Sequence, residues 1–295
     1  MDDVEVLADG HAFLEAPRWH DGHLYVSDFY LRRVYRLDDD GLAVVCAVPG
    51  QPSGLGHDPD GRLLVVSMID RRVLRLVDGT LHTVADLTAL APFHCNDMVV
   101  DAAGGAYVGN FGWDSSASDP IEPTTLVRVA PDGTASVAAE ELVFPNGCVL
   151  TPDGGTLIVA ETFAGRITAF DVAADGSLSR RRVWADLAPD ADWRTIPEAV
   201  ASGRPLPDGM ALDAEGAVWI GAATGDGALR VAEGGEILDH VPTGDRSVYA
   251  VALGGADRRT LYLCVSPPLL QTDPSAEHRS ALLAGRVAVP GAGRP

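Results

Sequence analysis

The sequence has few features of exported, membrane-spanning or thiol-dependent proteins. Its four cysteines, Cys46, Cys95, Cys148 and Cys264, lie far apart with no C-x-x-C spacing, which favours reduced, mostly buried thiols over a zinc site or a disulfide framework. No stretch approaches the roughly 20 consecutive apolar residues of a membrane helix. The opening segment Met1–Glu5 is acidic and has no basic region, so it does not resemble a signal peptide and we expect a cytoplasmic protein.

Basic residues are scarce relative to acidic ones. The chain has 22 Lys and Arg against 42 Asp and Glu, which gives a net charge of −20. A surface this acidic repels phosphate backbones and anionic lipid headgroups, so we expect neither nucleic acid nor a membrane as a partner. We expect a small-molecule substrate and a monomer or weak homo-oligomer.

Several common catalytic motifs are also missing. The sequence contains no G-x-S-x-G elbow, no H-E-x-x-H helix, no P-loop and no glycine-rich dinucleotide turn. These are the signatures of serine hydrolases, zinc proteases and nucleotide-dependent enzymes. The chemistry of this protein therefore has to come from another kind of site.

What the sequence does contain is a unit repeated six times. Each copy has four or five apolar residues, a glycine-containing turn and a second β-prone segment, and most copies are followed by further short strands. Dividing the 295 residues by six gives about 49 per copy, the size of a four-stranded propeller blade. The copies begin at Glu15, Ser53, Asn96, Asn146, Asp208 and Tyr249. We predict an all-β, six-bladed propeller that forms a single domain over residues 1–295.

Two segments lie outside the regular repeat. The β-prone ends of the chain, Val4–Leu7 and Gly285–Pro290, are predicted to share a sheet and so close the ring, which protects strand edges. Residues 188–207 form an insertion in which Pro197–Gly203 fits one or two helical turns, with proline at the start and glycine after the end. The insertion is either a surface excursion or a lid near the channel mouth, and its position directly before Asp208 favours a lid.

The first residue of most copies is polar. Counted back from the turn glycine, Asn96, Asn146 and Asp208 lie eight residues before it, and Glu15 lies seven before it. Because the innermost strands of a propeller line its axis, these oxygens are predicted to meet in a central channel. Buried carboxylates need a partner, and carboxylate and amide oxygens suit calcium, magnesium or manganese. The ordinary alternative is that each residue only satisfies backbone groups at a strand start.

Five motifs in this order resemble one known family across essentially the whole chain. They are Glu15–Trp19, Asn96–Gly104, Asn146–Gly154, Pro207–Trp219 and Pro242–Arg246. The sequence is similar to the senescence marker protein, gluconolactonase and luciferin-regenerating enzyme family of six-bladed propellers. The resemblance implies one divalent cation, with calcium first and manganese, magnesium or zinc as alternatives. It would be held by Glu15, Asn146 and Asp208, with Asn96 as a further ligand or a contact to substrate.

The resemblance also implies hydrolysis of a lactone or related ester. The metal would polarise the carbonyl, and Asp208 would take a proton from the attacking water. Sugar-lactone members commonly carry an arginine two residues before the asparagine, where this chain has His94, a shorter side chain that titrates near neutrality. His94 is a general acid, a group that orients a less polar substrate, or a loop histidine without a chemical role. Asp114 stands where relatives place an acid that contacts substrate.

The sequence is also compatible with two other functions. The same metal site could serve another reaction, such as phosphotriester hydrolysis or a biosynthetic step, because one fold hosts many chemistries. His94 and the insertion at 188–207 favour this alternative. The other alternative is a propeller that binds calcium without catalysing a reaction.

Overall fold

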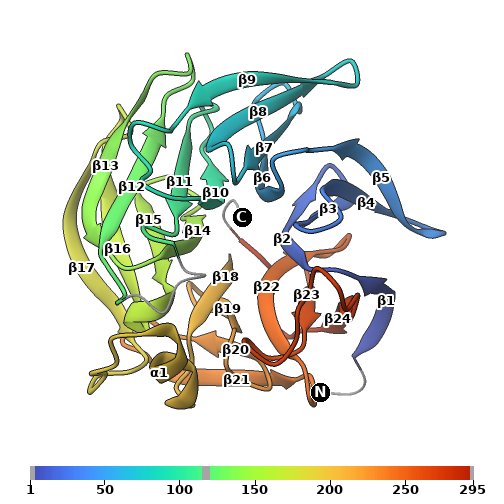
Figure 1. Cartoon of the computed structure of the whole chain (residues 1–295), viewed down its shortest axis with the longest axis vertical. Helices are drawn as coiled ribbons and strands as arrows, with labels where there is room; N and C mark the ends of the chain where they lie inside the picture. The colour runs from blue at the N-terminus through green and yellow to red at the C-terminus, as the bar shows by residue number, and fades with distance from the viewer. Residues whose placement is uncertain (1–3, 115–119, 293–295) are drawn as a thin grey trace.

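The chain forms six four-stranded antiparallel sheets arranged as blades around a central axis (Figure 1). The structure is a computed structural model that describes residues 4–114 and 120–292, so the acidic residues Asp2 and Asp3, noted above, lie outside the described residues. The predicted all-β propeller with six four-stranded blades is confirmed.

Each blade is built from strands that follow one another in the chain, except at the closure. Blade one contains β2 (Leu14–His20), β3 (His23–Asp28), β4 (Arg33–Asp38) and β5 (Gly41–Ala47), and blade two contains β6 (Pro52–His57), β7 (Leu63–Ser67), β8 (Arg72–Val77) and β9 (Thr80–Asp86). Blade three contains β10 (Cys95–Val100), β11 (Ala106–Asn110), β12 (Thr124–Val129) and β13 (Ala135–Leu142), and blade four contains β14 (Pro145–Leu150), β15 (Thr156–Glu161), β16 (Arg166–Val172) and β17 (Leu178–Asp186). Blade five contains β18 (Pro207–Leu212), β19 (Val218–Ala222), β20 (Gly227–Val231) and β21 (Ile237–Pro242). Blade six contains β22 (Ser247–Gly254), β23 (Thr260–Ser266), β24 (Ser280–Arg286) and β1 (Glu5–His11).

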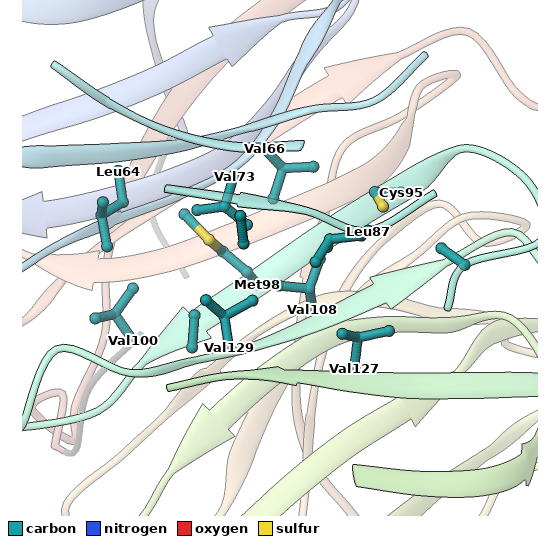
Figure 2. Packing of buried hydrophobic residues seen from close by; sticks show 13 residues of the cluster. Leu64, Val66, Val73, Leu87, Cys95, Met98, Val100, Val108, Val127 and Val129 are labelled. Atoms are coloured by element: carbon teal, nitrogen blue, oxygen red, sulfur yellow. The ribbon is translucent and has the colours of Figure 1, made fainter. Parts of the chain in front are cut away.

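The hydrophobic core lies between neighbouring blades. Figure 2 shows the interface of blades two and three, where Leu64 and Val66 pack with Met98 and Val108. These side chains are at most 2% exposed, and similar clusters lie between the other neighbouring sheets. Because face-to-face packing of twisted sheets buries the apolar side chains, the polar residues that begin the inner strands are left near the axis.

The two ends of the chain meet in blade six, as predicted. Strand β1 pairs antiparallel with β24, with Glu5 opposite Ala284 and His11 opposite Ser280. The C-terminal strand begins earlier than the sequence suggested, and the residues after it cross to blade five, where the Ala292 N–H donates to the Leu212 carbonyl over 2.8 Å. Figure 1 shows the blue strand β1 beside the red strand β24 in this blade. This pairing closes the ring of sheets.

The insertion between blades four and five contains the one α-helix of the described residues, α1 (Ile196–Ala201). It begins at a capping box in which the Thr195 side chain accepts from the Glu198 N–H and Glu198 reaches back. Gly203 follows with a left-handed φ of +65°, so the predicted helical turns are present and begin at Ile196. No helix of the described residues is long and apolar enough to cross a membrane.

Candidate metal and active site

The inner strands share a register shift close to their first residues. In blade three, Cys95 pairs with Asn110 and Met98 with Val108, so three steps on β10 match two on β11. Blades four and five show the same shift, between Pro145 and Cys148 and between Pro207 and Met210. A β-bulge of this kind bends a strand and re-aims its side chains. Asn96, Asn146 and Asp208 all lie inside these bulges.

Glycine follows two of these polar residues because neighbouring inner strands approach closely. A Cβ atom on Gly147 would lie 2.4 Å from the Asp208 carbonyl oxygen, and one on Gly209 would lie 2.5 Å from the Ala250 Cβ. Only glycine fits such contacts without a shift of backbone. The Asn-Gly and Asp-Gly pairs, which resemble turn signals in the sequence, are here a packing requirement at the axis.

Glu15 reaches the same place from a different register. It pairs with Ser27, in the way that Pro207 pairs with Ala222, one residue before the bulge. Ala16 therefore holds the slot that Asp208 holds in blade five, and its backbone is left-handed, with φ of 48°. Glu15 lies only seven residues before its turn glycine because β2 and β3 are joined by two residues, Asp21 and Gly22, whereas five residues join β18 to β19. The longer side chain of Glu15 compensates for the offset.

The four predicted metal-binding side chains are buried and line one cavity. Glu15 is 5% exposed, Asn96 4%, Asn146 3% and Asp208 6%. The Ser53 hydroxyl donates to Asn96 Oδ1 over 3.1 Å, and Asn146 Nδ2 donates to Thr162 Oγ1 over 3.1 Å. These bonds orient both amide groups at the axis. The structure thus brings together oxygens from blades one, three, four and five.

The charge at the axis is unbalanced. Burial raises the pKa of Glu15 well above its usual value, and repulsion from Asp208 and Asp97 raises it further. Burial and repulsion from Asp97 also raise the pKa of Asp208. Asp97 is paired with Arg18 at 2.6 Å. Three carboxylates and one guanidinium leave two negative charges when all are ionised.

These residues fit a divalent cation that prefers oxygen ligands. Among the described residues, Asp208 Oδ1 is buried without a hydrogen-bond partner, which is costly for a carboxylate unless a cation approaches it. The described chain contains no cluster of three or more His, Cys, Asp or Glu side chains suited to a metal. The axial set has two carboxylates, and its other oxygens come from amides, a combination that suits calcium, magnesium or manganese.

The cavity above this axial set is large and mostly apolar. It has a volume of about 660 Å³ and is lined by the segments that precede inner strands and by loops that follow second strands. His94 and Asp114, predicted to contact substrate, both line it. The His94 ring lies on Phe93, with centroids 4.0 Å apart and planes at 20°. Burial lowers the pKa of His94, an effect that Asp114 opposes, so burial favours a neutral imidazole here.

Comparison with known proteins identifies the family. Residues 13–266 match the family model described as the SMP-30/Gluconolactonase/LRE-like region. The chain belongs to this family. Within the SMP-30/gluconolactonase/LRE-like family, it is 28% identical to pentonolactonase XacC of Haloferax volcanii over 84% of this chain and 80% of that one. It is 27% identical to the 6-deoxy-6-sulfogluconolactonase of Pseudomonas putida over 95% of this chain and 93% of the other.

A solved structure shares the fold. Regucalcin from Agrobacterium tumefaciens, described as a calcium-binding protein, superposes with a TM-score of 0.80 at 20% identity, over 99% of this chain and 96% of that one. At this level of identity the likeness concerns the fold. The chain therefore shares both the family and the propeller fold of these proteins.

In this family member the structure adds an ion pair that the sequence did not predict. Arg18 Nη2 donates to Asp97 Oδ1 over 2.6 Å and to the Met98 carbonyl over 2.8 Å, while Nε donates to the Leu55 carbonyl over 3.0 Å. This guanidinium ties blades one, two and three together beside the axis. Its only signal in the sequence was its place in the Glu15–Trp19 motif.

The cysteines next to the axial residues are packing residues. Cys95 and Cys148 are free thiols and are at most 1% exposed. Burial raises the pKa of Cys95 to about 12 and also raises the pKa of Cys148. Since the thiolate is the reactive form, neither side chain is suited to act as a nucleophile.

Proposed function

We propose that this protein is a divalent-cation-dependent hydrolase that opens a lactone or a related ester. The observation that carries the proposal is the buried axial set, whose two carboxylates and two amides face one cavity with two negative charges in excess. The two curated relatives described above are named as lactonases, which supports the reaction class.

The cation would be held by Glu15, Asn146 and Asp208, with Asn96 as a further ligand or a contact to substrate. Calcium is the first candidate, and manganese, magnesium and zinc are alternatives. When bound, such a cation supplies a Lewis acid for a carbonyl oxygen. His94 and Asp114 are proposed to contact the substrate, because both line the cavity above these residues.

Asp208 is proposed as the general base. Its Oδ1 is buried and lacks a hydrogen-bond partner within the described chain, so it can accept a proton from water in the cavity that Asp208 lines. Asp208 accepts a proton as the water oxygen bonds to the carbonyl carbon. The ring C–O bond then breaks, and the leaving oxygen takes the proton back from Asp208. One water is consumed, and the product is a hydroxy acid.

The proposal predicts metal-dependent lactonase activity that requires Asp208. Chelator-treated protein should be inactive on a panel of sugar, aliphatic and aromatic lactones, and one of calcium, manganese, magnesium or zinc should restore turnover. Asp208→Asn keeps the size of the side chain but removes the charge, so kcat/KM should fall by about 100-fold or more. The measurement is a pH-indicator assay of acid release.

The matched control is Glu233→Gln, which removes one acid from an exposed turn of the same blade and should retain wild-type rates. Full activity in Asp208→Asn would remove this residue from the mechanism. Metal binding without opening of any lactone would instead support the non-enzymatic calcium-binding alternative and overturn the proposed function.

A further inference from the structure

Phenylalanine is concentrated around the cavity to an unusual degree. The chain contains seven phenylalanines, and six of them line this cavity: Phe13, Phe29, Phe93, Phe111, Phe144 and Phe163. The seventh, Phe170, is buried between blades three and four. The interfaces between blades are filled mainly by other apolar residues. Phenylalanine is therefore used in this chain chiefly to line the cavity.

The six rings lie in similar places in three blades, just before an inner strand or just after a second strand. In blade one, Phe13 lies two residues before Glu15, and Phe29 directly follows β3. In blade three, Phe93 lies three residues before Asn96 and Phe111 directly follows β11; in blade four, Phe144 lies two residues before Asn146 and Phe163 lies two residues after the end of β15. Each pair therefore flanks one of the axial residues.

The rings pack against one another as two walls. The Phe144 ring lies 4.6 Å from Phe111 and 4.9 Å from Phe163, measured between centroids. On the other side, the Phe13 ring lies 4.8 Å from Tyr249. Such offset and edge-to-face contacts hold aromatic rings in place, so the walls are formed before a ligand binds.

Beyond the axial set, the polar side chains that line the cavity are few and include Gln51, His94, Asp114 and Thr272. No arginine lines the cavity in the part of the chain that the structure describes, and the chain contains no lysine. The Tyr249 hydroxyl already donates to the Pro267 carbonyl over 2.8 Å, and the Thr162 hydroxyl donates to the Pro207 carbonyl over 2.8 Å. Hydroxyls pressed against phenyl rings would lose water without gaining hydrogen bonds.

The apolar surface continues to the mouth of the cavity. Tyr30, Ile69 and Leu270 are 40%, 43% and 65% exposed and all line it. The other large apolar side chains that are exposed in the described chain lie on the outermost strands β1, β5, β13, β17 and β21. A hydrocarbon group too long for the enclosed part of the cavity would still find apolar contacts at the mouth.

We propose that this site selects a lactone whose ring carries a hydrocarbon substituent, and that it disfavours a polyhydroxylated ring. The substituent lies between the Phe13–Tyr249 wall and the Phe111–Phe144–Phe163 wall, and the carbonyl faces the axial residues. This inference rests on the proposed lactone hydrolysis. The inference specifies which class of lactone the proposed reaction would act on.

The test compares lactones that share one ring. δ-Valerolactone, δ-nonalactone and D-glucono-1,5-lactone have a six-membered ring that is bare, alkylated or hydroxylated. With metal-loaded protein, kcat/KM should rise at least about tenfold from δ-valerolactone to δ-nonalactone, because the butyl chain is buried, and D-glucono-1,5-lactone should be the poorest substrate. A preference for D-glucono-1,5-lactone over δ-nonalactone would overturn the inference but leave the lactonase proposal intact.

Two variants locate the selectivity. Phe111→Ala and Phe163→Ala, which truncate the second wall, should each lower the ratio of kcat/KM for δ-nonalactone to that for δ-valerolactone by about tenfold. Phe170→Leu, at the one phenylalanine outside the cavity, is the control and should keep the wild-type ratio of the two rates. An unchanged ratio in both cavity variants, with folding confirmed by circular dichroism, would contradict the assignment.

Binding of unreactive analogues tests the proposed substrate preference even if the protein opens no lactone. Lactams are the probes, because their ring amide resists hydrolysis: 6-butyl-2-piperidinone carries the alkyl chain and D-glucono-δ-lactam carries the hydroxyls. Isothermal calorimetry should show tighter binding of the alkyl lactam. Equal or tighter binding of the glucono lactam would overturn the inference, whereas failure of every lactone in the activity assay would overturn only the reaction.

Discussion

At the scale of single residues, the axis combines oxygens that are costly to bury together. The Glu15 and Asp208 carboxylates are both buried, and their pKa values are raised first by that burial and then by neighbouring negative charge. Arg18 offsets one charge but is already held by Asp97. A bound divalent cation would remove the remaining repulsion, so the stability of the fold and the loading of the site should be linked.

Metal removal should therefore make the protein less stable as the pH rises. A raised folded-state pKa means that stability from Glu15 and Asp208 is present below the unfolded pKa of about 4 and is lost as the pH rises through the folded value. Thermal melts of chelator-treated protein between about pH 5 and pH 8, with and without calcium, measure this effect. Calcium should raise the Tm most at the upper end of the range.

The Asp208→Asn variant is the control for this prediction. Without metal at neutral pH it should be more stable than the wild type by about 1 to 3 kcal/mol, because a buried charge without a partner has been removed. Calcium should stabilise it less than the wild type. An equal response of the two proteins to calcium would place the cation elsewhere.

At the scale of elements, the start of each inner strand sets the geometry of the site. The bulges at Asn96, Asn146 and Asp208 turn these side chains toward the cavity, and the glycine after two of them lets adjacent inner strands touch. The inner strand of the neighbouring blade therefore requires glycine at positions 147 and 209. The insertion acts at the same end, where Ile196 of α1 lines the cavity and Trp193 Nε1 donates to the Phe163 carbonyl over 2.7 Å.

Gly147→Ala should lower both the stability of the protein and its affinity for calcium. The new methyl would meet the backbone of Asp208 and Gly209 at 2.4 and 2.7 Å, and overpacking against backbone typically costs about 1 to 3 kcal/mol. Because the displaced strand carries Asp208, calcium affinity should also fall by at least about tenfold. Urea unfolding and calorimetry measure the two effects.

Gly155→Ala is the matched control in the same blade. A Cβ atom there has the flexible Asp153 side chain as its nearest neighbour, at 3.3 Å, so stability should change by less than about 0.5 kcal/mol. If Gly147→Ala behaved like this control, the close approach of the inner strands would not be what requires glycine.

At the scale of the whole molecule, the ring is held closed by one strand from the start of the chain. Strand β1 completes a sheet whose other strands come from the last blade, and Leu282 of β24 packs in the cluster shared by blades six and one. Closure leaves no gap in the ring of inter-blade cores. Because every blade contacts two neighbours, we expect the sheets to unfold together.

Leu282→Ala tests the closing interface. The side chain is fully buried, and its truncation should lower the free energy of unfolding by about 2 to 5 kcal/mol. The urea transition should move as a single step. Val183→Ala on the outer strand β17, where the side chain is 57% exposed, should change stability by less than about 0.5 kcal/mol. A separate early transition in Leu282→Ala would show that blade six unfolds on its own.

The sequence by itself determined the repeat, the number of blades and the closure. Six apolar segments with glycine turns are local patterns, and strand periodicity is a local property of the chain. The same patterns predicted that Asn96, Asn146 and Asp208 share one place, since equivalent positions in a propeller face one axis.

Only the tertiary structure decided how these residues are supported. Counting along the chain could not show that Glu15 reaches the axis from a shifted register, or that Arg18 pairs with Asp97 two blades away. Nor could it show that six phenylalanines from three blades converge on one cavity. Such contacts depend on how twisted sheets pack and on where bulges aim side chains, and neither is encoded in the spacing of a single strand.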